Sequence, residues 1–157
     1  MDKVFELGEL KKIVEAKKGE GNRVIFANGV FDILHVGHIR YLKGARELGD
    51  ILVVAVNSDS SVKSYKGDDR PHTPEQERLE ILSSLHMVDY IVLFSEPDVA
   101  NLLLELKPHV QAKGTDYTEE TVPEKDIVAS YGGKVAIVGD AKDHSSTEMI
   151  EKVRSKG

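Results

Sequence analysis

The run ILVVAV at residues 51–56 restricts the possible folds of this chain more than any other segment, because it is apolar at every position. A strand with one face in water alternates apolar and polar residues, whereas a strand covered on both faces is apolar throughout. We therefore expect a parallel sheet with helices packed on both of its sides.

Short apolar runs and amphipathic stretches alternate along the rest of the chain. The predicted strands are residues 24–27, 51–56, 90–94, 109–112 and 134–138. Five helices are predicted after the first of these strands. The first has apolar residues at positions 39, 42, 45 and 48, and the second starts at the Thr-Pro-Glu-Gln sequence of residues 73–76. The other three span residues 98–106, 126–131 and 145–156. This order indicates right-handed βαβ crossovers.

The predicted fold class is therefore α/β, with a single Rossmann-like doubly wound domain and a five-stranded parallel sheet. We expect this domain over residues 23–157, after an N-terminal helical extension over residues 1–22. In such sheets ligands bind at the carboxyl ends of the strands. The polar stretch YKGDDRPH, residues 65–72, predicts a mobile loop beside that edge.

Composition disfavours several classes of function. The chain has no cysteine, which excludes thiolate and disulfide chemistry, and its net charge of −6 argues against broad binding to nucleic acid. The charged N-terminal segment lacks the apolar core of a signal peptide, and no run of about 18 apolar residues occurs. We expect a cytoplasmic protein with neither nucleic acid nor membrane as a partner.

Residues 28–38, NGVFDILHVGH, lie where the first predicted strand passes into the first predicted helix. A helix N-terminus presents backbone N–H groups and a positive dipole end to a phosphate, and Gly29 and Gly37 allow close approach of the backbone. His35 and His38 can both donate hydrogen bonds to one phosphate. Phosphoryl and nucleotidyl transfers need in-line positioning and charge neutralisation more than a protein nucleophile. This segment is the predicted catalytic site.

Two other interpretations of this segment are disfavoured. The two histidines could supply two ligands of a metal site. Such a site would need at least a third ligand, and none stands nearby in the sequence, so we predict no protein-bound metal. A dehydrogenase is disfavoured because the GxGxxG fingerprint is missing.

NGVFDILHVGH resembles the HxGH motif of the cytidylyltransferase-like nucleotidyltransferases, and SSTEMI, residues 145–150, is similar to a second motif of that family. The resemblance covers about residues 23–154. Within the family, the segments KGDDRP, PEQER, VDYIV and KGTDY stand in the order of the heptose-phosphate adenylyltransferases. The resemblance implies transfer of AMP from ATP to D-glycero-D-manno-heptose 1-phosphate, with release of pyrophosphate and formation of ADP-heptose. We expect the domain to be free-standing rather than fused to a kinase.

The resemblance also implies roles for individual residues. His35 and His38 would stabilise the α-phosphate, and Lys66, or Lys63 in its place, would bridge the nucleotide and acceptor phosphates. The implied nucleotide-binding residues are Val30, Phe31, Gly37, Lys113, Gly114, Ser145, Ser146 and Thr147. The implied substrate-binding residues are Asp32, Arg78 and Asp116. Simpler roles stay open, because Asp32 could order its turn, Arg78 could pair with a glutamate on its helix, and the serines could be plain helix caps.

The resemblance further implies Mg²⁺ held mainly by the nucleotide phosphates, a phosphorylated small-molecule acceptor and a homodimer. Valine at position 30 replaces the threonine of many relatives, and GDAKDH, residues 139–144, lacks the arginine of the glycerol-phosphate cytidylyltransferases, so Lys142 or His144 would replace it. The alternatives are a glycerol-3-phosphate cytidylyltransferase, an FAD synthetase, a non-catalytic nucleotide-binding module and a metal-dependent hydrolase.

Overall fold

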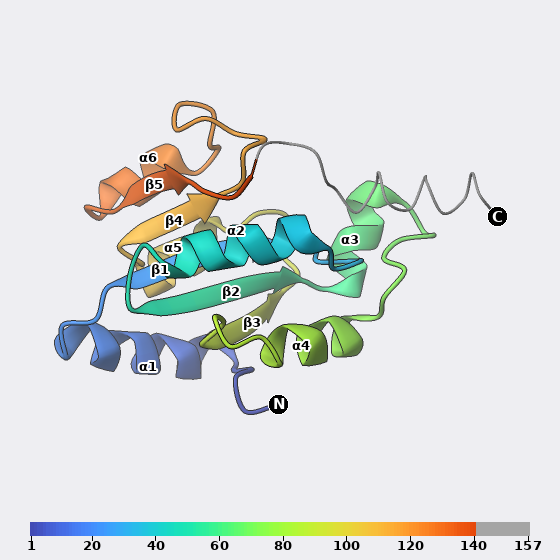
Figure 1. Ribbon diagram of the computed structural model, residues 1–157, viewed down its shortest axis with the longest axis horizontal. Coiled ribbons are helices and arrows are strands. Elements are labelled where there is room, and N and C mark those ends of the chain that lie inside the picture. Colours follow the sequence, from blue (N-terminus) through green and yellow to red (C-terminus); the bar gives the residue numbers. More distant parts are fainter. Residues whose placement is uncertain (141–157) are drawn as a thin grey trace.

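The computed structural model describes residues 1–140 of the chain (Figure 1). Its strands are β1 (Val24–Gly29), β2 (Ile51–Asn57), β3 (Tyr90–Phe94), β4 (Val110–Lys113) and β5 (Lys134–Ile137). Its helices are α1 (Leu7–Gly19), α2 (Val36–Arg46), α3 (Asp59–Lys66), α4 (Glu75–Ser83), α5 (Ala100–Leu106) and α6 (Lys125–Ser130). The predicted strands are confirmed with small shifts at their ends. The helix predicted over residues 145–156 lies outside the described residues.

The strands form one sheet in the order β3-β2-β1-β4-β5, and every neighbouring pair is parallel. The chain therefore runs from β1 outward through β2 to β3, and then crosses to the other side of β1 to form β4. This order confirms the predicted doubly wound, Rossmann-like topology. Strand order reverses between β1 and β4, and ligands bind at the carboxyl ends of the strands beside such a reversal.

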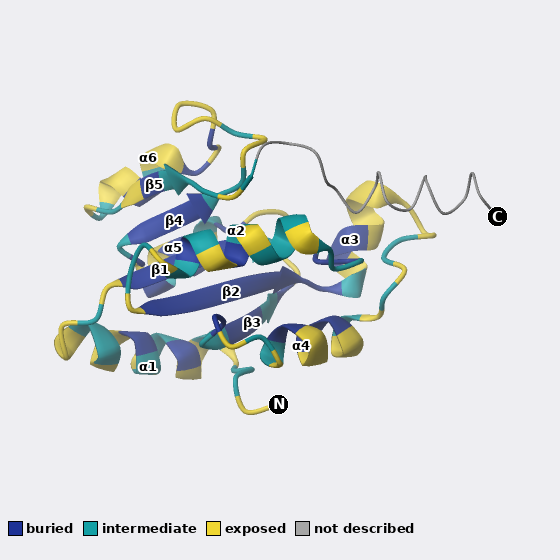
Figure 2. Cartoon of the chain, viewed as in Figure 1, coloured by how far each residue is buried: buried dark blue, intermediate teal, exposed yellow. Residues whose placement is uncertain are grey.

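Both faces of the sheet are covered by helices, as the apolar run of residues 51–56 predicts. All seven residues of β2 are buried (Figure 2), and its side chains alternate between two apolar clusters. Residues of α1, α5 and α6 complete one cluster, and residues of α2 and α4 complete the other. The sheet is the middle layer of a three-layer sandwich.

Helix α1 contributes to the first of these clusters. Leu10 and Val14 are 0% and 1% exposed and pack with residues of the sheet and α5. Residues 1–22 are thus part of the same packed structure, and the boundary drawn at residue 23 stays a prediction. Among residues 1–140, none of the helices combines the length and apolar character that crossing a bilayer requires.

Helix α3 was not predicted, and it changes the expected loop. The Ser58 side chain caps it by accepting a hydrogen bond from the Ser61 N–H at 3.2 Å, and Val62 is fully buried. Tyr65 and Lys66 belong to its last turn, so the connecting loop spans residues 67–74 rather than 65–72. A short helix with few apolar residues has little periodic signal in its sequence.

Candidate active site

The carboxyl ends of β1 and β4 adjoin at the point where strand order reverses. Helix α2 starts after the turn that follows β1, and its N-terminus lies at this edge of the sheet (Figure 1). The loop between α3 and α4 lies at the same edge, since its residues bond Asp32 of the turn after β1. Segments that are distant in sequence therefore meet here.

His35 and His38 form the N-terminus of α2, and their rings stack with centroids 4.1 Å apart. His35 is the N-cap residue, and its Nδ1 accepts a hydrogen bond from the Gly37 N–H at 3.0 Å. The His38 Nδ1 accepts one from the His35 N–H at 3.2 Å. Because each Nδ1 acts as an acceptor, each neutral ring carries its proton on Nε2. The backbone thus fixes two imidazoles as Nε2–H donors.

Burial, together with the neighbouring His35 and Lys66, lowers the pKa of His38 from its ordinary value of 6.5 to about 4. His38 is therefore a neutral hydrogen-bond donor near pH 7. Protonation of Nδ1 would also break the hydrogen bond from the His35 N–H. A neutral donor can contact a phosphate oxygen without the desolvation penalty of a buried cation.

The depressed pKa of His38 predicts how stability depends on pH. Between pH 6.5 and pH 4 the unfolded chain binds a proton that the native state does not bind. The contribution of this group to the free energy of unfolding is fully present above pH 6.5 and is lost as pH falls toward 4. Relative to a His38→Asn variant, the wild type should lose about 2–3 kcal/mol between pH 7 and pH 4.5, measured by urea unfolding at both values. An equal pH dependence in the two proteins would contradict the burial of His38.

The turn between β1 and α2 depends on Phe31 and Gly29. Phe31 has φ 54°, in the left-handed region, and its side chain is 5% exposed. Its ring lies 5.5 Å from that of His38. A Cβ on Gly29 would lie 3.1 Å from the Phe31 ring, which is tighter than ordinary contact. The absence of a side chain at Gly29 lets Phe31 fold back beneath the histidines.

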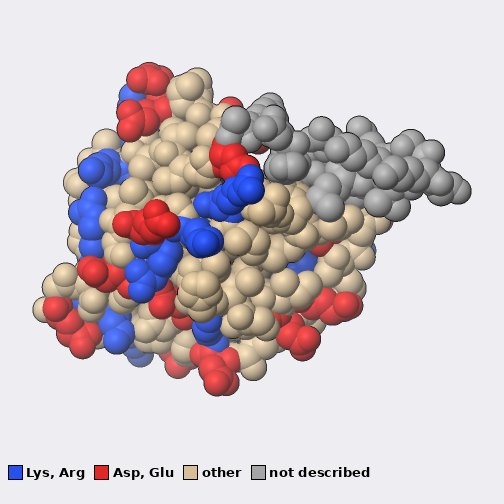
Figure 3. Space-filling model, viewed as in Figure 1, with Lys and Arg blue, Asp and Glu red and all other residues tan. Residues whose placement is uncertain are grey.

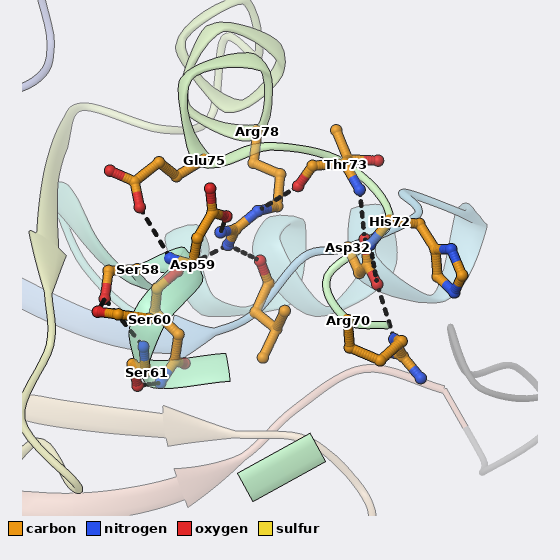
Figure 4. A network of polar contacts seen from close by, with 12 residues as sticks. Asp32, Ser58, Asp59, Ser60, Ser61, Arg70, His72, Thr73, Glu75 and Arg78 are labelled. Carbon is orange, nitrogen blue, oxygen red and sulfur yellow. Dashed lines mark hydrogen bonds and ion pairs between the residues drawn. The ribbon is translucent and has the colours of Figure 1, made fainter. Parts of the chain in front are cut away.

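Asp32 orders the α3–α4 loop (Figure 4). Its carboxylate, in a residue 2% exposed, accepts hydrogen bonds from the N–H groups of His72 and Thr73 and from the Arg70 Nε. Burial alone would raise the pKa of Asp32, but these donors together lower it. Protein N–H groups use both carboxylate oxygens. These contacts favour the simpler role, in which Asp32 fixes a loop, and its substrate-binding role stays a prediction.

Arg78 is likewise placed inside the protein rather than in the site. It is 1% exposed, and its guanidinium donates to the carbonyl oxygens of Thr73, Val30 and Asn57 and to the carboxylate of Asp59, at 2.7–2.9 Å (Figure 4). Contact with a substrate phosphate would require breaking these bonds. The contacts therefore favour a structural role for Arg78, and its substrate-binding role stays a prediction; the anionic partner of its guanidinium is Asp59 rather than a glutamate on its own helix.

Lys113, Gly114 and Asp116 follow the carboxyl end of β4, as predicted. The Lys113 Nζ lies 4.6 Å from the centre of the Tyr117 ring. Burial lowers the pKa of Lys113, although Glu124 and Asp116 oppose the shift. A Cβ on Gly114 would meet no described atom within 4 Å, so packing does not explain the glycine. Because β4 is the neighbour of β1 in the sheet, these residues lie at the carboxyl edge beside the strand-order reversal, where they can line a nucleotide site.

Lys66 ends α3 and is exposed. Partial desolvation of its ammonium group by the surrounding protein still lowers the pKa of Lys66, and Arg70 lowers it further, whereas Asp32 opposes the shift. Since Lys66 in turn lowers the pKa of His38, its charge acts on the histidine pair. Lys63 lies one turn earlier on the same helix.

Five predicted site residues lie outside the described part of the chain, and their roles stay predictions. They are Lys142, His144, Ser145, Ser146 and Thr147.

The sequence interpretation missed Arg70 and Tyr41. The Tyr41 hydroxyl donates to the Ala112 carbonyl at 2.7 Å and joins α2 to β4. Its place on the buried side of an amphipathic helix was a usable signal, whereas the only signal for Arg70 was its position before a proline in the loop beside the site.

On the face that α2 covers, basic and acidic side chains are interspersed (Figure 3). A hollow beside this helix, lined in part by Arg40, Lys43 and Asp140, is separate from the histidine pair.

A parallel sheet with a histidine pair at the helix N-terminus beside its strand-order reversal defines a Rossmann-like α/β protein. The family described as Cytidylyltransferase-like matches residues 26–154. The chain is 49% identical over 144 residues to the bifunctional protein HldE of Pelobacter propionicus, and 48% identical over 153 residues to that of Geotalea uraniireducens. These matches cover 92% and 98% of this chain but only 30% and 31% of the relatives' length.

Solved structures agree with this match. The lipopolysaccharide core biosynthesis protein from Thermoplasma volcanium has a TM-score of 0.67 and 34% identity, over 78% of this chain and all of that chain. Pantothenate synthetase from Thermus thermophilus has a TM-score of 0.65 at 17% identity, over 98% of this chain and 70% of that one, and shows a shared fold. The chain belongs to the cytidylyltransferase-like family of nucleotidyltransferases.

Proposed function

We propose that this protein transfers AMP from ATP to the phosphate of D-glycero-D-manno-heptose 1-phosphate, forming ADP-heptose and pyrophosphate. The observation that carries the proposal is the pair of Nε2–H donors that backbone hydrogen bonds fix at the N-terminus of α2. Both imidazoles lie at the edge of the sheet where nucleotides bind, and the lowered pKa of His38 keeps its ring neutral near pH 7.

The reaction is an in-line displacement at the α-phosphorus of ATP. An oxygen of the acceptor phosphate forms the new P–O bond, the bond from the α-phosphorus to the bridging oxygen breaks, and the electron pair leaves with pyrophosphate. His35 and His38 donate to non-bridging oxygens on which charge develops, assisted by the helix dipole and by backbone N–H groups near Val30 and Phe31. Lys66 offsets the repulsion between the two phosphates. No covalent enzyme intermediate is needed.

The base or ribose is assigned to Lys113, Gly114 and Asp116 at the end of β4, and the β- and γ-phosphates to Ser145, Ser146 and Thr147. Mg²⁺ would be held mainly by phosphate oxygens of the nucleotide and would neutralise their charge. The use of the Asp32 carboxylate by N–H donors of the α3–α4 loop supports this arrangement, in which the nucleotide rather than the protein supplies most of the oxygen ligands.

The heptose acceptor is supported by similarity to proteins named HldE and to a protein whose title places it in lipopolysaccharide core biosynthesis. The motif order KGDDRP, PEQER and KGTDY supports the same subgroup over the cytidylyltransferase and FAD synthetase alternatives. We further propose that the protein acts in the cytoplasm, where ATP is available, as a homodimer.

The test is pyrophosphate release with Mg²⁺, crossing ATP and CTP with heptose 1-phosphate, glycerol 3-phosphate and FMN. Release with ATP and heptose 1-phosphate alone is expected. Release with a different pair would retain the mechanism and refute the acceptor, and the absence of release with every pair would indicate a non-catalytic nucleotide-binding module. Analytical ultracentrifugation of the same sample tests the dimer.

A further inference from the structure

Arg70 lies on the loop between α3 and α4 and is held by Asp32. Its Nε donates to Asp32 Oδ2 at 3.0 Å, and the two side chains are 11% and 1% exposed. Figure 4 shows the guanidinium on the far side of Asp32 from Arg78. The ion pair fixes the orientation of the planar guanidinium, because Asp32 is itself held by two backbone N–H groups.

One end of this guanidinium is unused. The Arg70 Nη2 is buried and has no hydrogen-bond partner within the described part of the chain. Arg78 is the useful comparison, because its Nε, Nη1 and Nη2 all donate to protein oxygens. A buried donor without an acceptor costs free energy. Arg70 is thus built into the loop with a donor available to a ligand, whereas Arg78 is not.

Two cations lie close to Asp32 in this part of the fold. Lys66 and Arg70 carry one positive charge each, and the oxygens of Asp32 already accept several N–H groups, while Asp68 and Asp69 of the same loop are exposed to solvent. Arg70 lowers the pKa of Lys66 even with Asp32 nearby, which shows that the two cations repel each other. A phosphate beside them would relieve this repulsion, and a guanidinium binds phosphate oxygens through its fork of N–H donors.

The order of these groups indicates which phosphate. Lys66 ends α3, and Arg70 follows it on the loop that is bonded to Asp32 in the turn after β1. Lys66 and Arg70 therefore lie beside the turn that leads into the histidine pair. If the histidines hold the α-phosphate and Lys66 bridges to the attacking group, the next position is that of the attacking phosphate.

We propose that Arg70 binds the phosphate of the acceptor, held in position by Asp32, and so takes the role that the sequence assigned to Arg78. This inference rests on the proposed function, because the attacking phosphate belongs to that reaction. Arg70→Gln should raise KM for heptose 1-phosphate about 10-fold to 100-fold. KM for ATP should change by less than about 2-fold, because uniform binding of ATP is not altered. Arg70→Lys, which keeps the charge but loses the fork, should give an intermediate KM.

Arg46→Gln is the matched control. Arg46 also bonds an aspartate through Nε at 3.0 Å, that of Asp89, but at the opposite edge of the sheet. Its substitution should leave both KM values unchanged, and the Tm of each variant reports whether folding is preserved. Equal increases of KM for ATP and acceptor in Arg70→Gln, or a lower Tm with unchanged KM values, would show that Arg70 only orders the loop and would overturn the proposal.

Failure of the proposed function is separately visible, because the wild type would then release no pyrophosphate with heptose 1-phosphate. In that case calorimetric binding of inorganic phosphate decides the role of Arg70. Weaker binding by Arg70→Gln than by the wild type and Arg46→Gln would support a phosphate site, although of another acceptor. Identical or undetectable binding in all three proteins would overturn it.

Discussion

Replacing both His35 and His38 with asparagine should reduce kcat for pyrophosphate release by at least about 10³-fold while the protein stays folded. Asparagine can place its Oδ1 near the position of the histidine Nδ1, so it can still accept the backbone N–H groups of Gly37 and His35. Asparagine has no equivalent of the histidine Nε2–H, which is the donor that the mechanism requires. Loss of one well-placed oxyanion donor costs about 2.7–4 kcal/mol of barrier, and two such donors that act together are not additive.

The glutamine variants at the same positions are the control. Glutamine carries an N–H group near the position of the histidine Nε2 but has no acceptor at the position of Nδ1. The mechanism therefore predicts more residual kcat and lower stability for the glutamine pair than for the asparagine pair. Circular dichroism and urea unfolding measure the folded state of four proteins: the asparagine pair, the glutamine pair, the wild type and a His86→Asn surface variant. Turnover of the asparagine pair within about 10-fold of the wild type would exclude the histidines from the chemistry.

The parts of the fold that follow from local pattern were predictable. Five strands could be located because buried parallel strands are apolar throughout, as residues 51–56 are. The histidine pair could be located because strand, turn and helix N-terminus are consecutive in sequence, which places both rings without knowledge of tertiary structure. Helix α3 was missed because its sequence offers only the Ser58 cap and one buried apolar side chain, Val62.

The roles of Asp32, Arg70 and Arg78 could not be predicted in the same way. Arg78 bonds the carbonyls of Val30 and Asn57, which are 48 and 21 residues away in sequence. Asp32 bonds N–H groups 40 and 41 residues away. Whether an arginine faces a substrate or the interior depends on these distant contacts, and a sequence motif specifies the residue type alone. Arg70 lies on the α3–α4 loop and Arg78 on the helix that follows it, so the motif alone does not distinguish the two arginines.

Arg78→Met should lower the free energy of unfolding by about 3–5 kcal/mol, because it leaves a network of buried acceptors without their donor. Methionine fills similar volume but donates nothing to the Val30, Asn57 and Thr73 carbonyls, and it leaves the Asp59 carboxylate without its cation. Urea unfolding at pH 7 measures the loss. Arg46→Met is the control, because that ion pair with Asp89 has side chains 36% and 31% exposed and should cost less than about 1 kcal/mol.

The kinetic result for Arg78→Met separates a buried scaffold from a substrate contact. The network joins the turn after β1, the end of β2 and the start of α4, so its loss should lower kcat by shifting the histidines and the loop together. KM for ATP and for the acceptor should then change to a similar extent. If instead the variant kept the stability of the wild type and raised only KM for the acceptor, the Arg78 guanidinium would have to leave its four oxygens when substrate binds. Arg70 would then be the loop residue and Arg78 the phosphate ligand, the reverse of what the contacts of the two arginines favour.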